Sequence, residues 1–320
     1  MNIVVLDGAV LNPGDISWAP LEAIGTLCVY PETQPEAIVE RCLHADVVLV
    51  NKVRLDGHLV DALSHVRFIG LLATGYDNVD TKAFAQKNIP VTNVVAYGVP
   101  DVAEHAMTLL LELCHNTTLH SESVKRGKWA GTWCYWEKSP RCLSGSTMGI
   151  IGFGRIGRRV GELAHAFGMR VLTEKRKNAD VPAYSPFAFV SRDELFASSD
   201  VLSLHCPLTE ETRGLINAET IQRMKDGVLI INTARGPLID EEACAAALQS
   251  GKIGGLGTDV LAVEPPKPDN PLLCAPNTLI TPHMAWATTQ ARQRIIDRTR
   301  DNIVHWFAGN PTCVVNGVHP

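Results

Sequence analysis

Three polar residues that could perform acid–base chemistry each follow an apolar stretch. Arg235 ends "GVLIINTAR", Glu264 follows "GLGTDVLAV", and His283 follows "NTLITP". An arginine can pair with a carboxylate through its planar fork, and a histidine can give a proton near neutral pH. A neighbouring glutamate can orient the imidazole and favour its charged form. These groups suit the reduction of a 2-oxo acid, in which a hydride goes to carbon and a proton to oxygen.

Each of the three residues also has an ordinary structural interpretation. Taken singly, Arg235 suits an ion pair, Glu264 suits a helix or loop cap, and His283 suits a hydrogen-bonded core position. A catalytic role is favoured over these structural roles because each residue follows a strand-like run, and ligands bind at the carboxyl ends of strands in parallel α/β sheets. We therefore expect the three side chains to converge.

A glycine-rich run, "GIIGFGRIG", occupies residues 149–157. The spacing G-x-G-x-x-G also occurs in structural turns, but here it follows the apolar stretch "TMGII" and opens a helical stretch, as a dinucleotide site requires. Gly152 would make the turn, Gly154 would let the backbone approach a pyrophosphate, and Gly157 would let the helix lie against the sheet. We predict a dinucleotide site. The glycines alone leave a flavin open, whereas the three polar residues favour nicotinamide.

The choice between NAD and NADP depends on the residues after the next strand. An acidic residue that binds the ribose hydroxyls is expected about 20 residues after the glycines. Glu174 is the acid near that place, and Lys175, Arg176 and Lys177 follow it. A carboxylate there favours NAD, and cations favour the 2′-phosphate of NADP. Both cofactors stay open, with a slight preference for NADP, and a solvated basic loop is a third interpretation.

Two series of alternating strand-like and helix-like stretches must position these residues. Short β-branched runs recur in the N-terminal third and again from residue 147 onward, with helical spacing between them. Such alternation predicts βαβ units and mostly parallel sheets. A chain of 320 residues is long enough for two domains. We expect an α/β protein with two parallel-sheet domains, joined by one long helix over residues 101–120.

Composition and charge argue against several other classes of protein. The chain is 46% hydrophobic and 20% charged, as folded globular proteins are. Its net charge of −5 supplies no strong field for nucleic acid or an acidic membrane. We find no secretory signal and no apolar run long enough to span a bilayer. The nine cysteines include no C-x-x-C pair, so no metal site is expected. These features predict a cytoplasmic protein that acts on a small molecule.

The motifs together resemble the D-isomer-specific 2-hydroxyacid dehydrogenase family. The segments that carry the resemblance are "LLATGYDNVD", "GIIGFGRIG", "LHCPLTEETRGLI", "LIINTARGPLIDEEA", "GLGTDVLAVEPP" and "TPHMAWAT". The resemblance implies two Rossmann-like or flavodoxin-like domains: a discontinuous substrate domain of residues 1–97 and 287–320, and a dinucleotide-binding domain of residues 98–286. It also implies a homodimer formed through the dinucleotide-binding domain.

The resemblance assigns roles to individual residues. The same arginine, glutamate and histidine would be catalytic. Backbone amides of Thr74 and Gly75 would meet the substrate carboxylate together with Arg235, and Asp259 would meet the nicotinamide amide. The other implied cofactor contacts are Arg155, Ile156, His205, Cys206, Pro207, Thr212, Thr233 and Ala234. Aligned on "GFGRIG", Lys175 stands where NAD-using members usually carry Asp.

The segment "HMAWAT" and the N-terminal segment "LDGAVLNPGDISW" most resemble glycerate dehydrogenase and hydroxypyruvate reductase members of the family. We therefore expect NAD(P)-dependent reduction of hydroxypyruvate or glyoxylate to the D-2-hydroxy acid, with His283 as the proton donor. Two alternatives use the same fold. One is a nucleotide-sensing, corepressor-like binding protein, and the other is a related phosphite or formate dehydrogenase.

Overall fold

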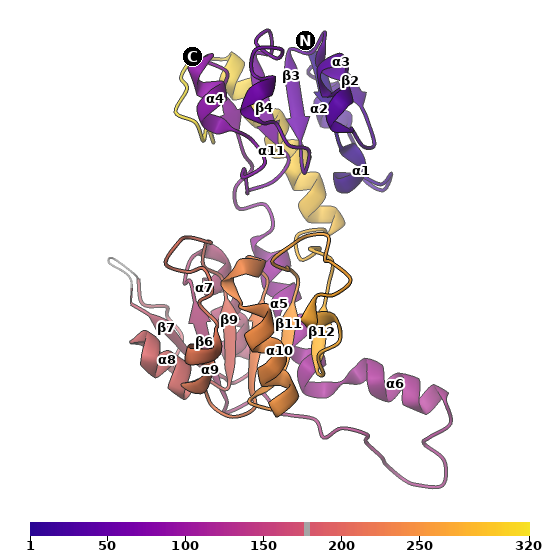
Figure 1. The fold of residues 1–320 in the computed structure, drawn as a ribbon, viewed down its shortest axis with the longest axis vertical. Coiled ribbons are helices and arrows are strands. Elements are labelled where there is room, and N and C mark those ends of the chain that lie inside the picture. The colour runs from indigo at the N-terminus through magenta and orange to yellow at the C-terminus, as the bar shows by residue number, and fades with distance from the viewer. Residues whose placement is uncertain (176–179) are drawn as a thin grey trace. The chain divides into compact units, whose positions relative to one another are not determined.

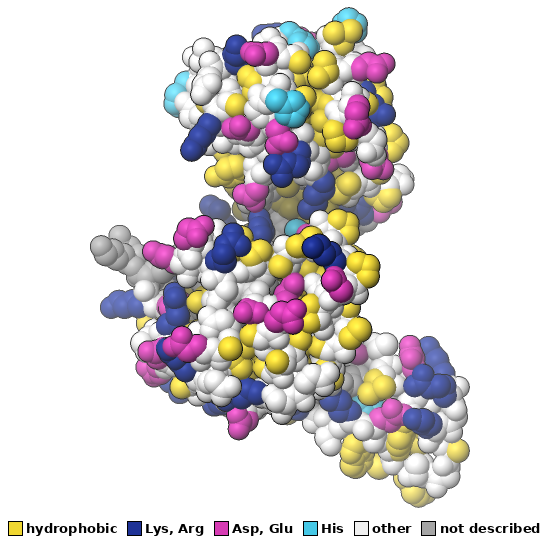
Figure 2. Space-filling model, viewed as in Figure 1, with side chains coloured by type: hydrophobic (Ala, Val, Ile, Leu, Met, Phe, Trp, Pro, Cys, Tyr) yellow, Lys and Arg dark blue, Asp and Glu magenta, His cyan; other side chains and the backbone are white. Residues whose placement is uncertain are grey.

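The computed structural model describes residues 1–175 and 180–320, which form two compact units. Unit 1 comprises Met1–Gly98 and Trp286–Pro320, and unit 2 comprises Val99–Ala285. Within the described residues, no helix combines the length and the apolar character needed to cross a membrane. Basic and acidic side chains are interspersed on the face that Figure 2 shows, in keeping with the small net charge.

Unit 1 is built on a five-stranded parallel sheet (Figure 1). Its strands are β1 (Asn2–Val5), β2 (Thr26–Val29), β3 (Val47–Val50), β4 (Phe68–Leu71) and β5 (Val91–Thr92). The order β2-β1-β3-β4-β5 is that of flavodoxin-like folds. Strands β3 and β4 are buried along their whole length, which explains why they read as continuous apolar runs rather than alternating ones.

Helices cover both faces of the sheet in unit 1. They are α1 (Gly8–Leu11), α2 (Ala19–Glu22), α3 (Ile38–Cys42), α4 (Thr81–Gln86) and α11 (Thr289–Phe307). One hydrophobic cluster contains Ile38 of α3 and Phe84 of α4. Another contains Ile295 and Ile303 of α11 together with residues of β1 and β3. The C-terminal helix therefore packs in the same unit as the N-terminal strands, and unit 1 is discontinuous in sequence.

Unit 2 is built on a seven-stranded parallel sheet. Its strands are β6 (Thr147–Ile151), β7 (Arg170–Glu174), β8 (Phe187–Val190), β9 (Val201–Leu204), β10 (Val228–Asn232), β11 (Ile253–Thr258) and β12 (Thr278–Ile280). The order is β12-β11-β10-β9-β6-β7-β8. This is the doubly wound arrangement in which the chain reverses direction across the sheet between β6 and β9. The predicted fold class, with two parallel-sheet α/β domains, is confirmed.

The helices of unit 2 are α5 (Val99–His115), α6 (Thr117–Lys125), α7 (Arg155–Ala166), α8 (Arg192–Ser198), α9 (Ala218–Gln222) and α10 (Glu241–Ser250). The prediction of one helix over residues 101–120 is wrong. The helix ends before Asn116, which has a φ of +48° and separates α5 from α6. Asparagine tolerates this left-handed conformation better than most residues, so it can interrupt a helix that its neighbours would continue.

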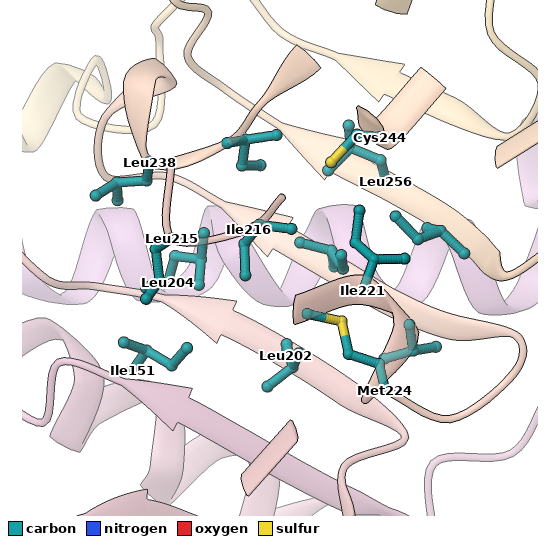
Figure 3. Close-up of a cluster of buried hydrophobic side chains, with 14 of the residues drawn as sticks. Ile151, Leu202, Leu204, Leu215, Ile216, Ile221, Met224, Leu238, Cys244 and Leu256 are labelled. Atoms are coloured by element: carbon teal, nitrogen blue, oxygen red, sulfur yellow. The ribbon is translucent and has the colours of Figure 1, made fainter. Parts of the chain in front are cut away.

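The hydrophobic core of unit 2 lies on both sides of its sheet. Figure 3 shows one side, where Leu202 and Leu204 of β9 meet residues from α9, α10 and the connecting loops. On the other side, Leu109 and Leu113 of α5 pack with Leu229 of β10. Because helices shield both faces, the loops at the carboxyl ends of the strands are where the sheet opens to a ligand.

Candidate active site

The predicted glycine loop lies at the carboxyl end of β6 and leads directly into α7. Gly152 has a φ of +95°, and a Cβ there would collide with the backbone of His205 and Cys206 after β9. A Cβ on Gly157 would collide with the carbonyl oxygen of Gly152. At Gly154, by contrast, nothing lies within 4 Å of the Cβ position. Gly152 and Gly157 thus allow tight packing, whereas Gly154 leaves open space at the N-terminus of α7, where backbone N–H groups can bind a phosphate.

A second observation supports a nucleotide at this edge. The hydroxyl of Thr233, directly after β10, is buried and has no hydrogen-bond partner among the described residues. Buried hydroxyls in folded proteins nearly always have a partner, so this one is suited to completion by a ligand. The open position at Gly154 and the unpaired Thr233 both fit a dinucleotide. Arg155 and Ile156, which the resemblance gives as cofactor contacts, are the first two residues of α7.

The turn after β9 carries three of the expected cofactor contacts: His205, Cys206 and Pro207. Nε2 of His205 lies 2.8 Å from Ser203 Oγ, within hydrogen-bond distance. Burial lowers the pKa of His205 to about 4. The ring is therefore neutral at pH 7. Thr212 donates to the carbonyl oxygen of Pro207 at 2.8 Å, so it braces this turn.

Toward the β7–β8 side of the sheet, Glu174 ends β7 as expected, but its carboxylate is already paired. Arg192, the first residue of α8, donates through Nε to Glu174 Oε1 at 2.7 Å and through Nη2 to Oε2 at 3.4 Å. The two side chains are 45% and 26% exposed, respectively, so the pair is open to exchange. Lys175 is exposed, and Arg176 lies outside the described residues. Sequence reasoning missed Arg192, because nothing in its local sequence links it to Glu174.

Glu264 and His283 are in direct contact. Nδ1 of His283 lies 2.6 Å from Glu264 Oε2, and Glu264 Oε1 accepts a hydrogen bond from Leu261 N–H at 3.0 Å. The two side chains are about one-third exposed, which leaves them accessible to a ligand. Since Glu264 engages Nδ1, Nε2 is the nitrogen through which the imidazole can give a proton.

Arg235 follows β10, the strand next to β11 in the sheet. Its Nη1 donates to the carbonyl oxygen of Ala234 at 2.8 Å, and the carbonyl oxygen of Arg235 accepts a hydrogen bond from Asn232 Nδ2 at 2.9 Å. A Cβ on the following residue, Gly236, would collide with the backbone of Leu261. The loop that carries Arg235 therefore lies against the loop that carries Glu264. The structure thus brings the expected residues to adjacent loops.

Asp259 is buried, with 1% of its surface exposed, and holds the loop before and after His283. Its Oδ1 accepts from Thr281 Oγ1 at 2.6 Å and from Met284 N–H at 2.8 Å, and its Oδ2 accepts from Ala285 N–H at 2.8 Å. The expected contact with a nicotinamide amide stays a prediction. What the structure adds is a network that sequence reasoning missed.

The two expected substrate contacts in unit 1, Thr74 and Gly75, follow β4. Thr74 Oγ1 donates to the carbonyl oxygen of Val94 at 2.7 Å, and Asn93 Nδ2 donates to the carbonyl oxygen of Thr74 at 2.7 Å. These bonds fix the loop at the carboxyl edge of the five-stranded sheet. The proposed role of the two backbone amides is consistent with that location.

Comparison with known proteins adds independent findings. The family model "D-isomer specific 2-hydroxyacid dehydrogenase, NAD binding domain" matches residues 107–285. The chain is 44% identical over 321 residues to hydroxypyruvate reductase of Blautia hydrogenotrophica, covering 99% of this chain and 100% of the relative. It is 39% identical over 286 residues to glycerate dehydrogenase of Methylorubrum extorquens, covering 88% of each. The apo-structure of D-lactate dehydrogenase from Escherichia coli is similar, with a TM-score of 0.84 at 30% identity and 98% coverage of both chains.

The chain belongs to the D-isomer specific 2-hydroxyacid dehydrogenase family. It is an oxidoreductase, and unit 2 contains the binding domain for its nicotinamide dinucleotide. The resemblance and the enzyme class expected from the motifs are thus confirmed. The corepressor-like protein and the phosphite or formate dehydrogenase are not favoured, because relatives that match most of the chain are named for enzymes of 2-hydroxy or 2-oxo acids.

Proposed function

We propose that this protein reduces a small 2-oxo acid, hydroxypyruvate or glyoxylate, to the corresponding D-2-hydroxy acid. The observation that carries the proposal is the 2.6 Å contact between His283 and Glu264, on a loop that lies against the Arg235 loop. The relatives named hydroxypyruvate reductase and glycerate dehydrogenase support this choice of substrate.

Each residue has a separate task in the proposed reaction. The guanidinium of Arg235 binds the substrate carboxylate. When bound, the reduced nicotinamide supplies a hydride to the carbonyl carbon. The imidazolium of His283 gives its Nε2 proton to the carbonyl oxygen, while Glu264 holds Nδ1–H and balances the charge. The backbone amides of Thr74 and Gly75 in unit 1, the proposed substrate domain, add donors for the carboxylate.

The proposal is tested by assaying the purified enzyme on hydroxypyruvate, glyoxylate, pyruvate and larger 2-oxo acids. His283→Ala should lower kcat by about 10²–10⁴, the usual contribution of a positioned acid. Arg235→Ala should both raise KM and lower kcat, because the carboxylate loses its partner before and during the reaction. Unchanged turnover in both folded variants would refute the assignment.

For the cofactor, we propose a modest preference for NADPH over NADH. Support comes from Arg192, which neutralises the carboxylate that would otherwise repel a 2′-phosphate, and from the exposed cation Lys175. The test compares kcat/KM for NADPH and NADH in the wild type and in Lys175→Asp. A ratio that the substitution does not move would show that the basic segment is a solvated loop.

We also propose a homodimer formed through unit 2. After α6 the chain forms an arm, residues 126–142 (Figure 1). Three tryptophans on this arm are 53%, 98% and 59% exposed: Trp129, Trp133 and Trp136. Lys128, Ser123 of α6 and Tyr135 each donate a hydrogen bond to the Glu137 carboxylate, which ties the arm to α6 and lowers the pKa of Glu137 to about 2. Large exposed aromatic groups on an ordered arm suit a protein interface. If the arm forms the interface, light scattering of Trp133→Ser should show a smaller particle mass than the wild type, shifted toward the monomer.

The cytoplasmic location of the protein stays a prediction.

A further inference from the structure

The loop that carries His283 has an unusual backbone. His283 has a φ of +53°, a left-handed conformation that costs a non-glycine residue on the order of 1 kcal/mol or more. Its N–H donates to the carbonyl oxygen of Asp259 at 2.8 Å, and the next two N–H groups donate to the Asp259 carboxylate. The surroundings of Asp259 therefore hold the strained residue in place.

A histidine from a distant helix reaches the same network. Nε2 of His105, in α5, lies 2.9 Å from Thr281 Oγ1, which donates at 2.6 Å to Asp259 Oδ1. Since the single hydroxyl proton of Thr281 goes to Asp259, the Nε2 of His105 must carry the proton that Thr281 accepts. Nε2 also lies 3.6 Å from Asp259 Oδ1 itself. The hydroxyl of Thr281 therefore links α5 to the buried carboxylate.

Burial makes this network more than a surface contact. The side chain of His105 is 17% exposed and that of Asp259 is 1% exposed. In such surroundings an unmatched donor or acceptor is costly, so a hydrogen-bonded chain favours one arrangement strongly. Helix α5 also packs on the sheet through Leu109 and Leu113. It therefore provides a rigid anchor for the network.

We infer that His105 and Thr281 are positioning residues for His283. In this role they act through Asp259: they keep its carboxylate oriented so that residues 283–285 present the imidazole to Glu264. The inference rests on the proposed function, in which His283 donates the proton. Removing the link should let the loop shift, and small displacements of a catalytic group can cost up to about 10² in rate.

The test uses Thr281→Val, which removes the hydroxyl at nearly constant volume, and Thr281→Ser, which keeps it. Thr281→Val should lower kcat about tenfold or more, while the affinity for 2′,5′-ADP, which lacks the nicotinamide that Asp259 is predicted to contact, should change less than twofold. Thr281→Ser should recover most of the loss. As a second pair, His105→Phe should lower kcat, and His105→Gln, which retains an N–H donor, should recover part of it.

A double-mutant cycle separates positioning from general structural support. In a His283→Ala background, Thr281→Val should have no further effect on the residual rate, because there is no imidazole left to position. An equal loss in both backgrounds, or no loss from Thr281→Val in the wild type, would overturn this inference alone. If His283→Ala itself kept full activity, the proposed function would fail as well. The two failures are therefore distinguishable.

Discussion

The two ends of the seven-stranded sheet use an acidic residue in opposite ways. At the β11–β12 end, Asp259 is buried and accepts hydrogen bonds from the loop around His283. At the β7–β8 end, Glu174 is partly exposed and pairs with Arg192, which is itself 45% exposed. The Asp259 carboxylate is held in a buried hydrogen-bond network, whereas the Glu174 carboxylate forms an ion pair with a solvent-exposed arginine.

The difference follows from the cost of breaking each contact. When a buried carboxylate loses its hydrogen-bond donors, the folded state is destabilised, because the carboxylate is then neither hydrated nor paired. The same holds for buried N–H groups that lose the carboxylate. An exposed pair replaces its partner with water at a cost of about 0–1 kcal/mol. The geometry of proton transfer is therefore rigid, whereas the preference for one nucleotide can be changed by local charge.

The largest effect is expected from Asp259→Ala. It leaves the N–H groups of Met284 and Ala285 without their acceptor, and we expect the free energy of unfolding to fall by about 3 kcal/mol and kcat to fall with it. Chemical denaturation and steady-state assays measure the two. Asp200→Ala is the control, because Asp200 accepts from Thr147 N–H at the amino end of β6 and is more exposed. A variant of Asp259 as stable as the Asp200 control would contradict the contrast.

A smaller effect, on activity alone, is expected from Glu264→Gln. The pair with His283 is about one-third exposed, so the free energy of unfolding should change by less than about 1 kcal/mol. Because the imidazolium loses its counter-charge, kcat should fall by about tenfold. A substantial loss of stability would show that this pair, like Asp259, is part of the buried support.

At the opposite end, Arg192→Ala should change nucleotide preference without changing stability. An uncompensated Glu174 repels a 2′-phosphate, so affinity for 2′,5′-ADP should fall by up to about tenfold while affinity for 5′-AMP stays level or rises. Calorimetric titration of both nucleotides gives the ratio. Arg192→Lys, which keeps the charge, is the matched control. Equal weakening for both nucleotides would contradict the proposed effect of charge.

The smallest effect near neutral pH is expected from His205→Gln. The pKa of His205 is lowered from 6.5 to about 4 by burial, so the unfolded chain binds a proton between those values and the folded protein does not. Stability conferred by the neutral ring is therefore lost as the pH falls through this window, by up to about 1.4 kcal/mol per pH unit. Denaturation curves at pH 7, 6 and 5 should show a shallower loss for the variant. Parallel curves for the two proteins would exclude this cause.

Much of the fold and part of the site could be predicted from local patterns. Short-range patterns predict the strands β3 and β4 from their apolar runs and the turn after β6 from its glycines, because these features depend on residues close in the chain. The same is true of polar residues that directly follow β10 and β11, because neighbouring parallel strands bring their ends together. The break at Asn116 could not be predicted, because asparagine also occurs within helices, and only its left-handed conformation in the structure separates α5 from α6.

The sequence by itself determined the family, the two α/β units and the candidate roles of Arg235, Glu264 and His283. These features could be predicted because the residues of each motif lie close together in the sequence, and the conformational preferences of the backbone act over the same short range. Only the tertiary structure decided that Arg192 pairs with Glu174 and that His105 reaches Asp259 through Thr281. In each case the partners come from separate elements, and their contact exists only because packing against a shared sheet brings those elements together.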